Sequence, residues 1–191
     1  MKLVLASTSP FRHELLSRLG QAFETAAPDS DESRFDNEPA DKMVLRLAEK
    51  KARSIADKFP KALIIGSDQV ATVDDLILGK PGTHEKAVQQ LQHVSGKSVL
   101  FHTGLCLLNS ETDQAQRVWV PFEVRFRSLS DQQIESYLLK EKPYNCAGSF
   151  KSEALGITLF EKLSGDDPTA LMGLPLIELT SMLMAEGCLL P

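Results

Sequence analysis

The stretch LASTSPFRHELL, residues 5–16, contains the first side chains that could bind an anion. Ser9 and Pro10 are typical of a helix N-cap and first helical residue, which places Arg12 in the first turn. A cation is unfavourable there because the helix dipole is positive at its N-terminus. An anion would explain the arginine, with backbone N–H groups and the hydroxyls of Ser7 and Ser9 as further donors. Alternatively, Ser9 only caps the helix and Arg12 pairs with a surface acid.

Further polar residues that could bind a ligand or take part in a reaction follow along the chain. Asp68 comes after an apolar run typical of a buried strand, where a carboxylate needs a metal, a cation or several hydrogen bonds. Lys51 lies near the apolar face of an amphipathic helix, so its ammonium must reach solvent or meet an anion. Lys80 in the segment GKP could contact phosphate, and the acidic run DSDES, which contains Glu32, could supply oxygen ligands to Mg²⁺ or Mn²⁺.

Each of these signals has a plain structural alternative. Asp68 could be satisfied by the backbone of a turn after Gly66, and Lys80 and the acidic run could simply be solvated. Taken together, the serines, cations and carboxylates are the inventory of a metal-assisted phosphate-ester site. No Walker A or GxGxxG sequence is present, which argues against the usual ATPase and dinucleotide sites.

Composition narrows the class of protein. The chain has 191 residues, 42% of them hydrophobic, and a formal net charge of −5, so we expect one well-packed domain and no binding to nucleic acid polymers. We expect no membrane association and a cytoplasmic location, because no apolar run is long enough to span a bilayer and MKLVLASTSP is unlike a signal peptide. The spacing of the three cysteines and four histidines predicts neither a disulfide framework nor a zinc site.

The pattern of apolar residues predicts the elements that must position these side chains. Strands and helices alternate in the manner of an α/β fold with a mixed sheet, and Pro121 suggests a bulge or an edge in the last long strand. We expect strands at residues 2–7, 62–73, 76–81, 97–110 and 116–129, the last two antiparallel, and helices at 10–20, 40–59, 83–94, 130–141 and 174–187. Residues 144–167 are expected to form loops and short strands.

Several motifs also resemble those of a known family. LASTSPFRHELL, RLAEKKA, IIGSDQV, LGKP, CAGSFKSEALG and GLPL stand in the order and spacing of the Maf family of nucleotide pyrophosphatases, over essentially the whole chain. The resemblance implies one domain over residues 1–191, with an elongated, twisted mixed sheet, flanking helices and two lobes around a cleft, similar to the inosine triphosphatases. It also implies hydrolysis of modified nucleoside triphosphates to the monophosphate and pyrophosphate, with Mg²⁺, Mn²⁺ or Co²⁺ as cofactor. Homodimers are common in the family.

The resemblance assigns roles to individual residues. It implies that Asp68 is the catalytic residue and that Glu32 and Asp68 lie at the metal. The residues expected to bind the substrate phosphates are Ser7, Ser9, Arg12, Lys51 and Lys80.

Three positions bear on the base of the nucleotide. Phe11, Gln69 and Glu153 resemble the subgroup that acts on 7-methyl-GTP, whereas the dTTP and UTP subgroup resembles an Arg, Thr and Gln pattern. N7-methylation makes guanine cationic, so Phe11 could stack on it where an arginine would repel it. Glu153 could accept hydrogen bonds from the N1–H and amine of guanine, which uracil and thymine lack. His13 departs from the family, which often has Arg there.

Two alternatives remain. One is the same reaction on dTTP, UTP or another nucleotide. The other is a non-catalytic regulator, because the family has also been linked to septum formation. The position of Asp68 at a strand end, near lysines, favours the enzyme.

Overall fold

The computed structural model describes residues 1–74 and 76–190 and has an α/β fold. The strands are β1 (Lys2–Ala6), β2 (Phe23–Ala26), β3 (Ala62–Val73), β4 (Leu76–Leu78), β5 (Ser98–Asn109), β6 (Gln114–Phe126) and β7 (Phe160–Ser164). The helices are α1 (Pro10–Ser17), α2 (Ala40–Arg53), α3 (His84–Val94), α4 (Asp131–Glu141), α5 (Pro168–Leu171) and α6 (Leu176–Ala185). Short 3₁₀ segments are η1 (Ala56–Lys58), η2 (Ala147–Ser149) and η3 (Leu155–Leu159). No helix in the described part of the chain is long and apolar enough to cross a membrane.

The strands form one mixed sheet, which confirms the predicted fold class. Their order is β2-β1-β3-β5-β6-β7, with β4 paired to β3 outside this path. β1 runs parallel to β2 and β3, whereas β4 is antiparallel to β3 and β7 is antiparallel to β6. The chain divides into two compact units: unit 1 comprises residues 1–69, 103–120 and those from Asp167 onward, and unit 2 comprises 70–102 and 121–166. The expectation of one domain stays a prediction.

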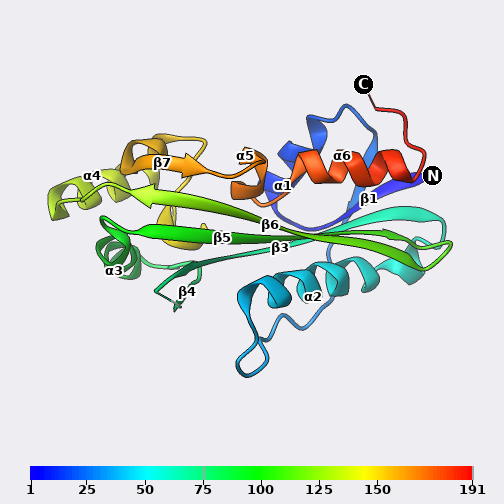
Figure 1. Cartoon of the computed structure of the whole chain (residues 1–191), viewed down its shortest axis with the longest axis horizontal. Coiled ribbons are helices and arrows are strands. Elements are labelled where there is room, and N and C mark those ends of the chain that lie inside the picture. The colour runs from blue at the N-terminus through cyan, green and yellow to red at the C-terminus, as the bar shows by residue number, and fades with distance from the viewer. Residues whose placement is uncertain (75, 191) are drawn as a thin grey trace. The chain divides into compact units, whose positions relative to one another are not determined.

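Unit 1 has a sheet that is covered on both faces. Side chains alternate along β1, so that Leu3 and Leu5 pack with α1 and α6 while Val4 and Ala6 pack with α2 (Figure 1). The continuous apolar runs of β1 and β3 follow from this burial on both faces. Full burial of each large aliphatic side chain contributes about 1.5–3 kcal/mol.

Unit 2 has a core rich in aromatic residues. Phe150 lies edge-on to Phe101, Phe126 and Phe160, with ring centroids 5.4, 5.6 and 4.8 Å away. Such edge-to-face pairs add about 0.5–1.5 kcal/mol each beyond the area that they bury. This cluster attaches the segment after α4 to strands β5, β6 and β7.

The N-cap predicted at Ser9 is confirmed, and two further helices are capped in the same way. Ser9, Thr83 and Ser130 each accept a hydrogen bond from the backbone N–H three residues later. Ser130 also forms a capping box with Gln133. A cap of this kind stabilises its helix by about 1 kcal/mol.

The structure corrects two details of the predicted elements. The helix expected over 40–59 ends at Arg53, where a turn leads into η1. The short strand β2 was not predicted. The edge predicted as one of two alternatives at Pro121 is confirmed, because Pro121 precedes the part of β6 that pairs with β7 and its missing N–H costs no bond in that ladder. The irregularity in the pairing of β6 with β7 lies between Arg125 and Phe126, where the register shifts. Asp75, between the strands expected at 62–73 and 76–81, lies outside the described residues.

Candidate active site

The turn from β1 into α1 presents two serine hydroxyls. Ser7 is buried, and its Oγ accepts the backbone N–H of Ser9 at 3.1 Å. The Oγ of Ser9 accepts the backbone N–H of Arg12 at 3.4 Å. In both cases the hydroxyl oxygen acts as acceptor, so each O–H group can donate to a bound anion. Phe11 lies in the same first turn and is partly buried.

Two glycines bring α2 unusually close to the sheet. A β-carbon added at Gly66 in β3 would lie 2.0 Å from the carbonyl oxygen of Ala48, and one at Gly104 in β5 would lie 2.2 Å from that of Val44. Both distances are far too short for any other residue type, so the backbone of α2 rests directly on the two strands. Lys51, one turn after Ala48, is thereby held against β3.

Lys51 forms the centre of a charged cluster. Its Nζ lies 2.6 Å from Oδ1 of Asp68 and 3.1 Å from Oε2 of Glu32. The Lys51 and Asp68 side chains are only 7% and 10% exposed, whereas that of Glu32 is 55% exposed. The structure therefore brings together three residues that the sequence analysis singled out. The interpretation of Asp68 as a carboxylate satisfied only by turn backbone is wrong, because a buried ammonium compensates its charge.

Arg12 lies near this cluster with part of its guanidinium unpaired. Its Nε donates to the carbonyl oxygen of Gly173 at 2.8 Å, and its terminal nitrogens bond to no described residue. Burial lowers the pKa of Arg12, and the charges of Asp68 and Glu32 oppose that shift. The group stays charged, because the ordinary pKa of arginine lies so far above neutrality. The alternative that Arg12 pairs with a surface acid is therefore wrong, and its terminal N–H groups remain available for an anion.

Four side chains from α1, β3 and β5 bind α5 and the turn that follows it. Ser67 Oγ is 2.9 Å from the carbonyl oxygen of Gly173, which also accepts from Arg12. Gln69 donates its Nε2 to Thr103 Oγ1 at 3.0 Å and to the carbonyl oxygen of Ala170 at 2.7 Å. Thr103 Oγ1 in turn donates to the Ala170 carbonyl oxygen at 2.9 Å. Both N–H groups of the Gln69 amide therefore donate to protein oxygens, and Oε1 is the amide atom left to accept a hydrogen bond.

The remaining predicted residues belong to unit 2. Lys80 follows β4 and is exposed, and Glu153 is exposed after η2. Burial raises the pKa of the Cys146 thiol, and the charge of Lys80 lowers it while that of Glu153 raises it. Both charged groups therefore lie within electrostatic reach of one side chain. Their assignment to phosphate and base stays a prediction.

The family model described as Maf-like protein matches residues 2–186 of the chain. The chain belongs to the Maf family. It is 57% identical over 185 residues to a protein of Nitrosococcus oceani named 7-methyl-GTP pyrophosphatase, covering 97% of this chain and 93% of that protein. Proteins of the same name from Methylobacillus flagellatus and Pseudomonas aeruginosa are 56% and 53% identical, covering 97% and 99% of this chain and 96% and 98% of their own length.

The carboxylates of this Maf protein fit a hard divalent cation. Asp68 and Glu32 both contact the Lys51 ammonium, so the two carboxylates face the same point, and carboxylate oxygens are the ligands that a hard cation prefers. Magnesium is typically held by one or two carboxylates together with substrate phosphates. No group of three or more His, Cys, Asp or Glu suited to a metal occurs among residues 1–74 and 76–190. Two carboxylates without a third such ligand in the described part of the chain are consistent with a cation site that the phosphates of the substrate complete.

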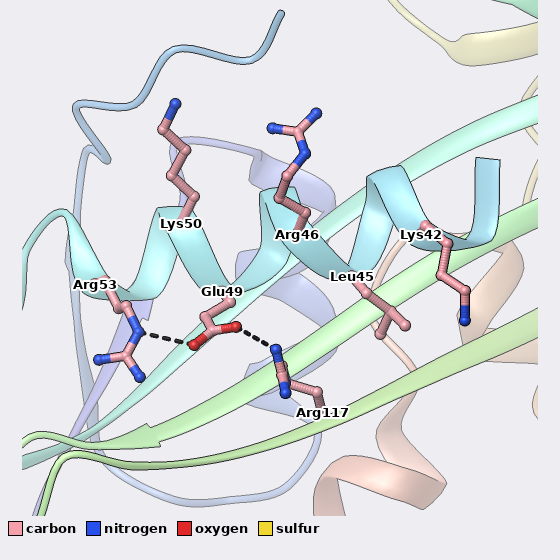
Figure 2. Close-up of a pocket in the computed structure, with 7 residues that line it drawn as sticks. All are labelled: Lys42, Leu45, Arg46, Glu49, Lys50, Arg53 and Arg117. Atoms are coloured by element: carbon pink, nitrogen blue, oxygen red, sulfur yellow. Dashed lines mark hydrogen bonds and ion pairs between the residues drawn. The ribbon is translucent and has the colours of Figure 1, made fainter. Parts of the chain in front are cut away.

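A separate hollow of about 630 Å³ lies along α2 of the Maf protein. Figure 2 shows Glu49 at its centre, bonded to Arg53 and Arg117, with Arg46 and Lys50 directed to the other side of the helix. Its lining residues are Lys42, Leu45, Arg46, Glu49, Lys50, Arg53 and Arg117. The basic side chains are engaged by acids, so the hollow lacks the unpaired cation that Arg12 provides.

Sequence reasoning missed several residues of this Maf site. Ser67 and Thr103 are fully buried and hydrogen-bonded to the α5–α6 turn. A polar residue next to Asp68 in an apolar run was a usable signal for Ser67. Thr103 gave none, because threonine is common in strands.

Proposed function

We propose that this Maf protein hydrolyses 7-methyl-GTP to 7-methyl-GMP and pyrophosphate with the help of a divalent cation. One observation carries the proposal: the buried Asp68 carboxylate lies beside Lys51, and the half-paired guanidinium of Arg12 feels its charge. Cations held next to a carboxylate suit a reaction in which a polyphosphate must bind and a water must lose a proton. The names of the relatives support the substrate.

In the proposed mechanism, the phosphates are held by N–H and O–H groups that donate no hydrogen bond within the described part of the chain. The terminal nitrogens of Arg12 and the hydroxyls of Ser7 and Ser9 donate to phosphate oxygens at the N-terminus of α1. The family resemblance also predicts a role in phosphate binding for Lys80, which belongs to unit 2. A divalent cation held by Glu32, Asp68 and the phosphates would withdraw charge from the phosphorus.

Asp68 is proposed as the general base. Its Oδ1 accepts the hydrogen bond from Lys51, so Oδ2 is the atom that takes the proton of the attacking water. Lys51 orients the carboxylate through this hydrogen bond. Positioned general bases typically contribute about 10²- to 10⁴-fold in rate.

The base of the nucleotide is assigned to Phe11, Gln69 and Glu153. The partly exposed ring of Phe11 would stack on the cationic 7-methylguanine, which is worth about 0.5–2 kcal/mol. Gln69 Oε1 and the exposed carboxylate of Glu153 are acceptors, and guanine offers donors at N1 and the amine.

A panel of triphosphates tests this function. Pyrophosphate release is measured with 7-methyl-GTP, GTP, dTTP and UTP, each with Mg²⁺, Mn²⁺ or Co²⁺. We expect the highest kcat/KM for 7-methyl-GTP, and loss of about 10²-fold or more in Asp68→Asn, measured below the thermal transition of that variant, which the loss of the Asp68 charge beside Lys51 should lower. A preference for dTTP or UTP would contradict the substrate, and a fully active Asp68→Asn protein would remove Asp68 from the mechanism.

A further inference from the structure

The position of Glu32 depends on the loop that carries it. Glu32 lies in the segment between β2 and α2, which has no helix or strand. Its carboxylate contacts Lys51 and bonds to no other described residue, and the side chain is 55% exposed. The contact with Lys51 alone cannot hold this exposed carboxylate in one place, because the Lys51 and Glu32 side chains each have several rotatable bonds. Other anchors must therefore order the loop.

Arg46 of α2 is the main anchor of that loop. Its Nε and Nη2 each lie 2.6 Å from one oxygen of Glu38, a bidentate pair, and Nη2 also donates to the carbonyl oxygen of Ser33 at 3.1 Å. The guanidinium carbon lies 4.0 Å from the ring centroid of Phe35. One side chain of the helix thus contacts three residues of the loop.

The bidentate geometry of the Arg46–Glu38 pair distinguishes it from an ordinary surface ion pair. The two side chains are only 23% and 9% exposed. Hydrogen bonding by Arg46 lowers the pKa of Glu38, and the same bond raises the pKa of Arg46. Bidentate arginine–carboxylate pairs also define an orientation, which a lysine at the same place would not.

The loop is closed on itself around this pair. Arg34 donates to the backbone carbonyl oxygen of Glu38 at 2.9 Å, and the Glu38 carboxylate accepts the backbone N–H of Phe35 at 3.2 Å. Lys50, one turn after Arg46, donates to the carbonyl oxygen of Asp31 at 2.9 Å, next to Glu32. Figure 2 shows Arg46 and Lys50 projecting from α2 on the side away from Glu49 and Arg117.

We propose that Arg46 is a positioning residue that holds the loop of residues 31–38 on α2, so that Glu32 is presented beside Lys51 and Asp68. The effect on the metal rests on the proposed function, because it assumes that Glu32 helps to bind the cation. Arg46 itself touches neither Asp68 nor Lys51. Its contribution is to reduce the freedom of a carboxylate that has to bind with little reorganisation.

Two measurements on the full chain test the proposal. Hydrogen exchange of peptides covering residues 29–39, recorded without nucleotide or metal, reports the order of the loop. Pyrophosphate release from 7-methyl-GTP as a function of Mn²⁺ concentration reports the role of Glu32. The variants are Arg46→Ala and Glu38→Gln, which remove opposite halves of one pair. Arg53→Ala is the matched control, because Arg53 lies two turns further along α2 and pairs with Glu49 and Asp113.

We expect faster exchange over residues 31–38 in both test variants and wild-type exchange in Arg53→Ala. The Mn²⁺ concentration for half-maximal rate should rise about 10-fold or more in Arg46→Ala and Glu38→Gln, with kcat at saturating Mn²⁺ retained. Arg46→Lys should restore it only in part, since a lysine cannot make the bidentate contact. Should Arg46→Ala fail to fold, the loop exchange and the Mn²⁺ requirement of Glu38→Gln alone test the proposal.

Wild-type exchange of the loop in the test variants would overturn the proposal. Faster exchange with an unchanged Mn²⁺ requirement would also overturn it, because the loop would then be held for stability alone. Absence of pyrophosphate release by the wild-type protein would instead count against the proposed function, and the exchange data would still decide whether Arg46 orders the loop.

Discussion

The Nζ atom of Lys51 lies 2.6 Å from Oδ1 of Asp68, and both side chains are at least nine-tenths buried. The contact joins α2 to β3 at the point where Gly66 lets the helix approach the sheet. A buried pair of this kind adds little net stability, because desolvation offsets the attraction. Removal of one partner is costly, however, since the other is left as an uncompensated charge.

Lys51→Met should therefore destabilise the protein strongly. The methionine fills a similar volume but leaves the Asp68 carboxylate without its nearest cation. We expect the free energy of unfolding to fall by about 3–5 kcal/mol at neutral pH, measured by urea denaturation. Lys42→Met is the control, because the Lys42 side chain is 69% exposed and its loss should change stability by no more than about 0.5 kcal/mol.

Gly66→Ala tests whether the close approach of α2 positions the site. The added methyl group would lie 2.0 Å from the Ala48 carbonyl oxygen, so the helix must move outward and take Lys51 with it. We expect a loss of at least about 1–3 kcal/mol in stability and a large fall in pyrophosphate release. Gly79→Ala is the stability control, because nothing lies within 4 Å of an added β-carbon there. Equal stability of the two variants would contradict the geometry.

Cys106 should be chemically silent in the native protein. Burial in the core under α2 raises the pKa of its thiol to about 12. Because the unfolded thiol titrates near pH 8.5, this group makes a contribution to stability that is complete below that pH and is lost as the pH rises toward 12. Iodoacetamide at pH 8 should label Cys106 only in urea, as read by mass spectrometry, whereas the partly exposed Cys188 should react without it. Labelling of both at one rate in the native protein would contradict this expectation.

Much of unit 1 could be predicted because its signals are local. The cap at Ser9 and the short apolar run that marks β1 depend on neighbours in sequence, and both predictions were confirmed. Lys51 and Asp68 stood out because each is a charged residue in an apolar pattern. Their direct pairing was not predicted, since it depends on Gly66 and Gly104, whose role is visible only when α2 lies on the sheet.

Other parts could not be predicted because they depend on distant contacts. β2 has the sequence FETA, is partly exposed and lacks the apolar run that marks a strand. Arg46 looks like an ordinary surface arginine until the loop with Glu38 folds back on it. Gly173 acquires importance only through its carbonyl oxygen, which accepts from Arg12 and Ser67, residues more than 100 positions away.

Thr103 is expected to control which atom of the Gln69 amide faces the substrate. Its Oγ1 accepts from Gln69 Nε2 at 3.0 Å and donates to the carbonyl oxygen of Ala170 at 2.9 Å, so it holds the amide with Oε1 outward. Thr103→Val keeps the shape but removes one hydrogen bond from the Gln69 amide and one from the Ala170 carbonyl oxygen, which should cost about 1–3 kcal/mol.

The consequence for specificity distinguishes a role in positioning Gln69 from a role in packing. With Thr103 replaced by valine, Gln69 Nε2 keeps only its contacts to the carbonyl oxygens of Ala170 and Leu171, so Oε1 is presented to a guanine less rigidly. The ratio of kcat/KM for 7-methyl-GTP over dTTP should fall, and Thr103→Ser, which retains the hydroxyl, should restore the wild-type ratio. A lowered stability with an unchanged ratio would mean that Thr103 stabilises the contact between β5 and α5 without directing Gln69, because a less well placed acceptor should weaken recognition of the paired N1–H and amine donors of guanine, a pair that thymine lacks.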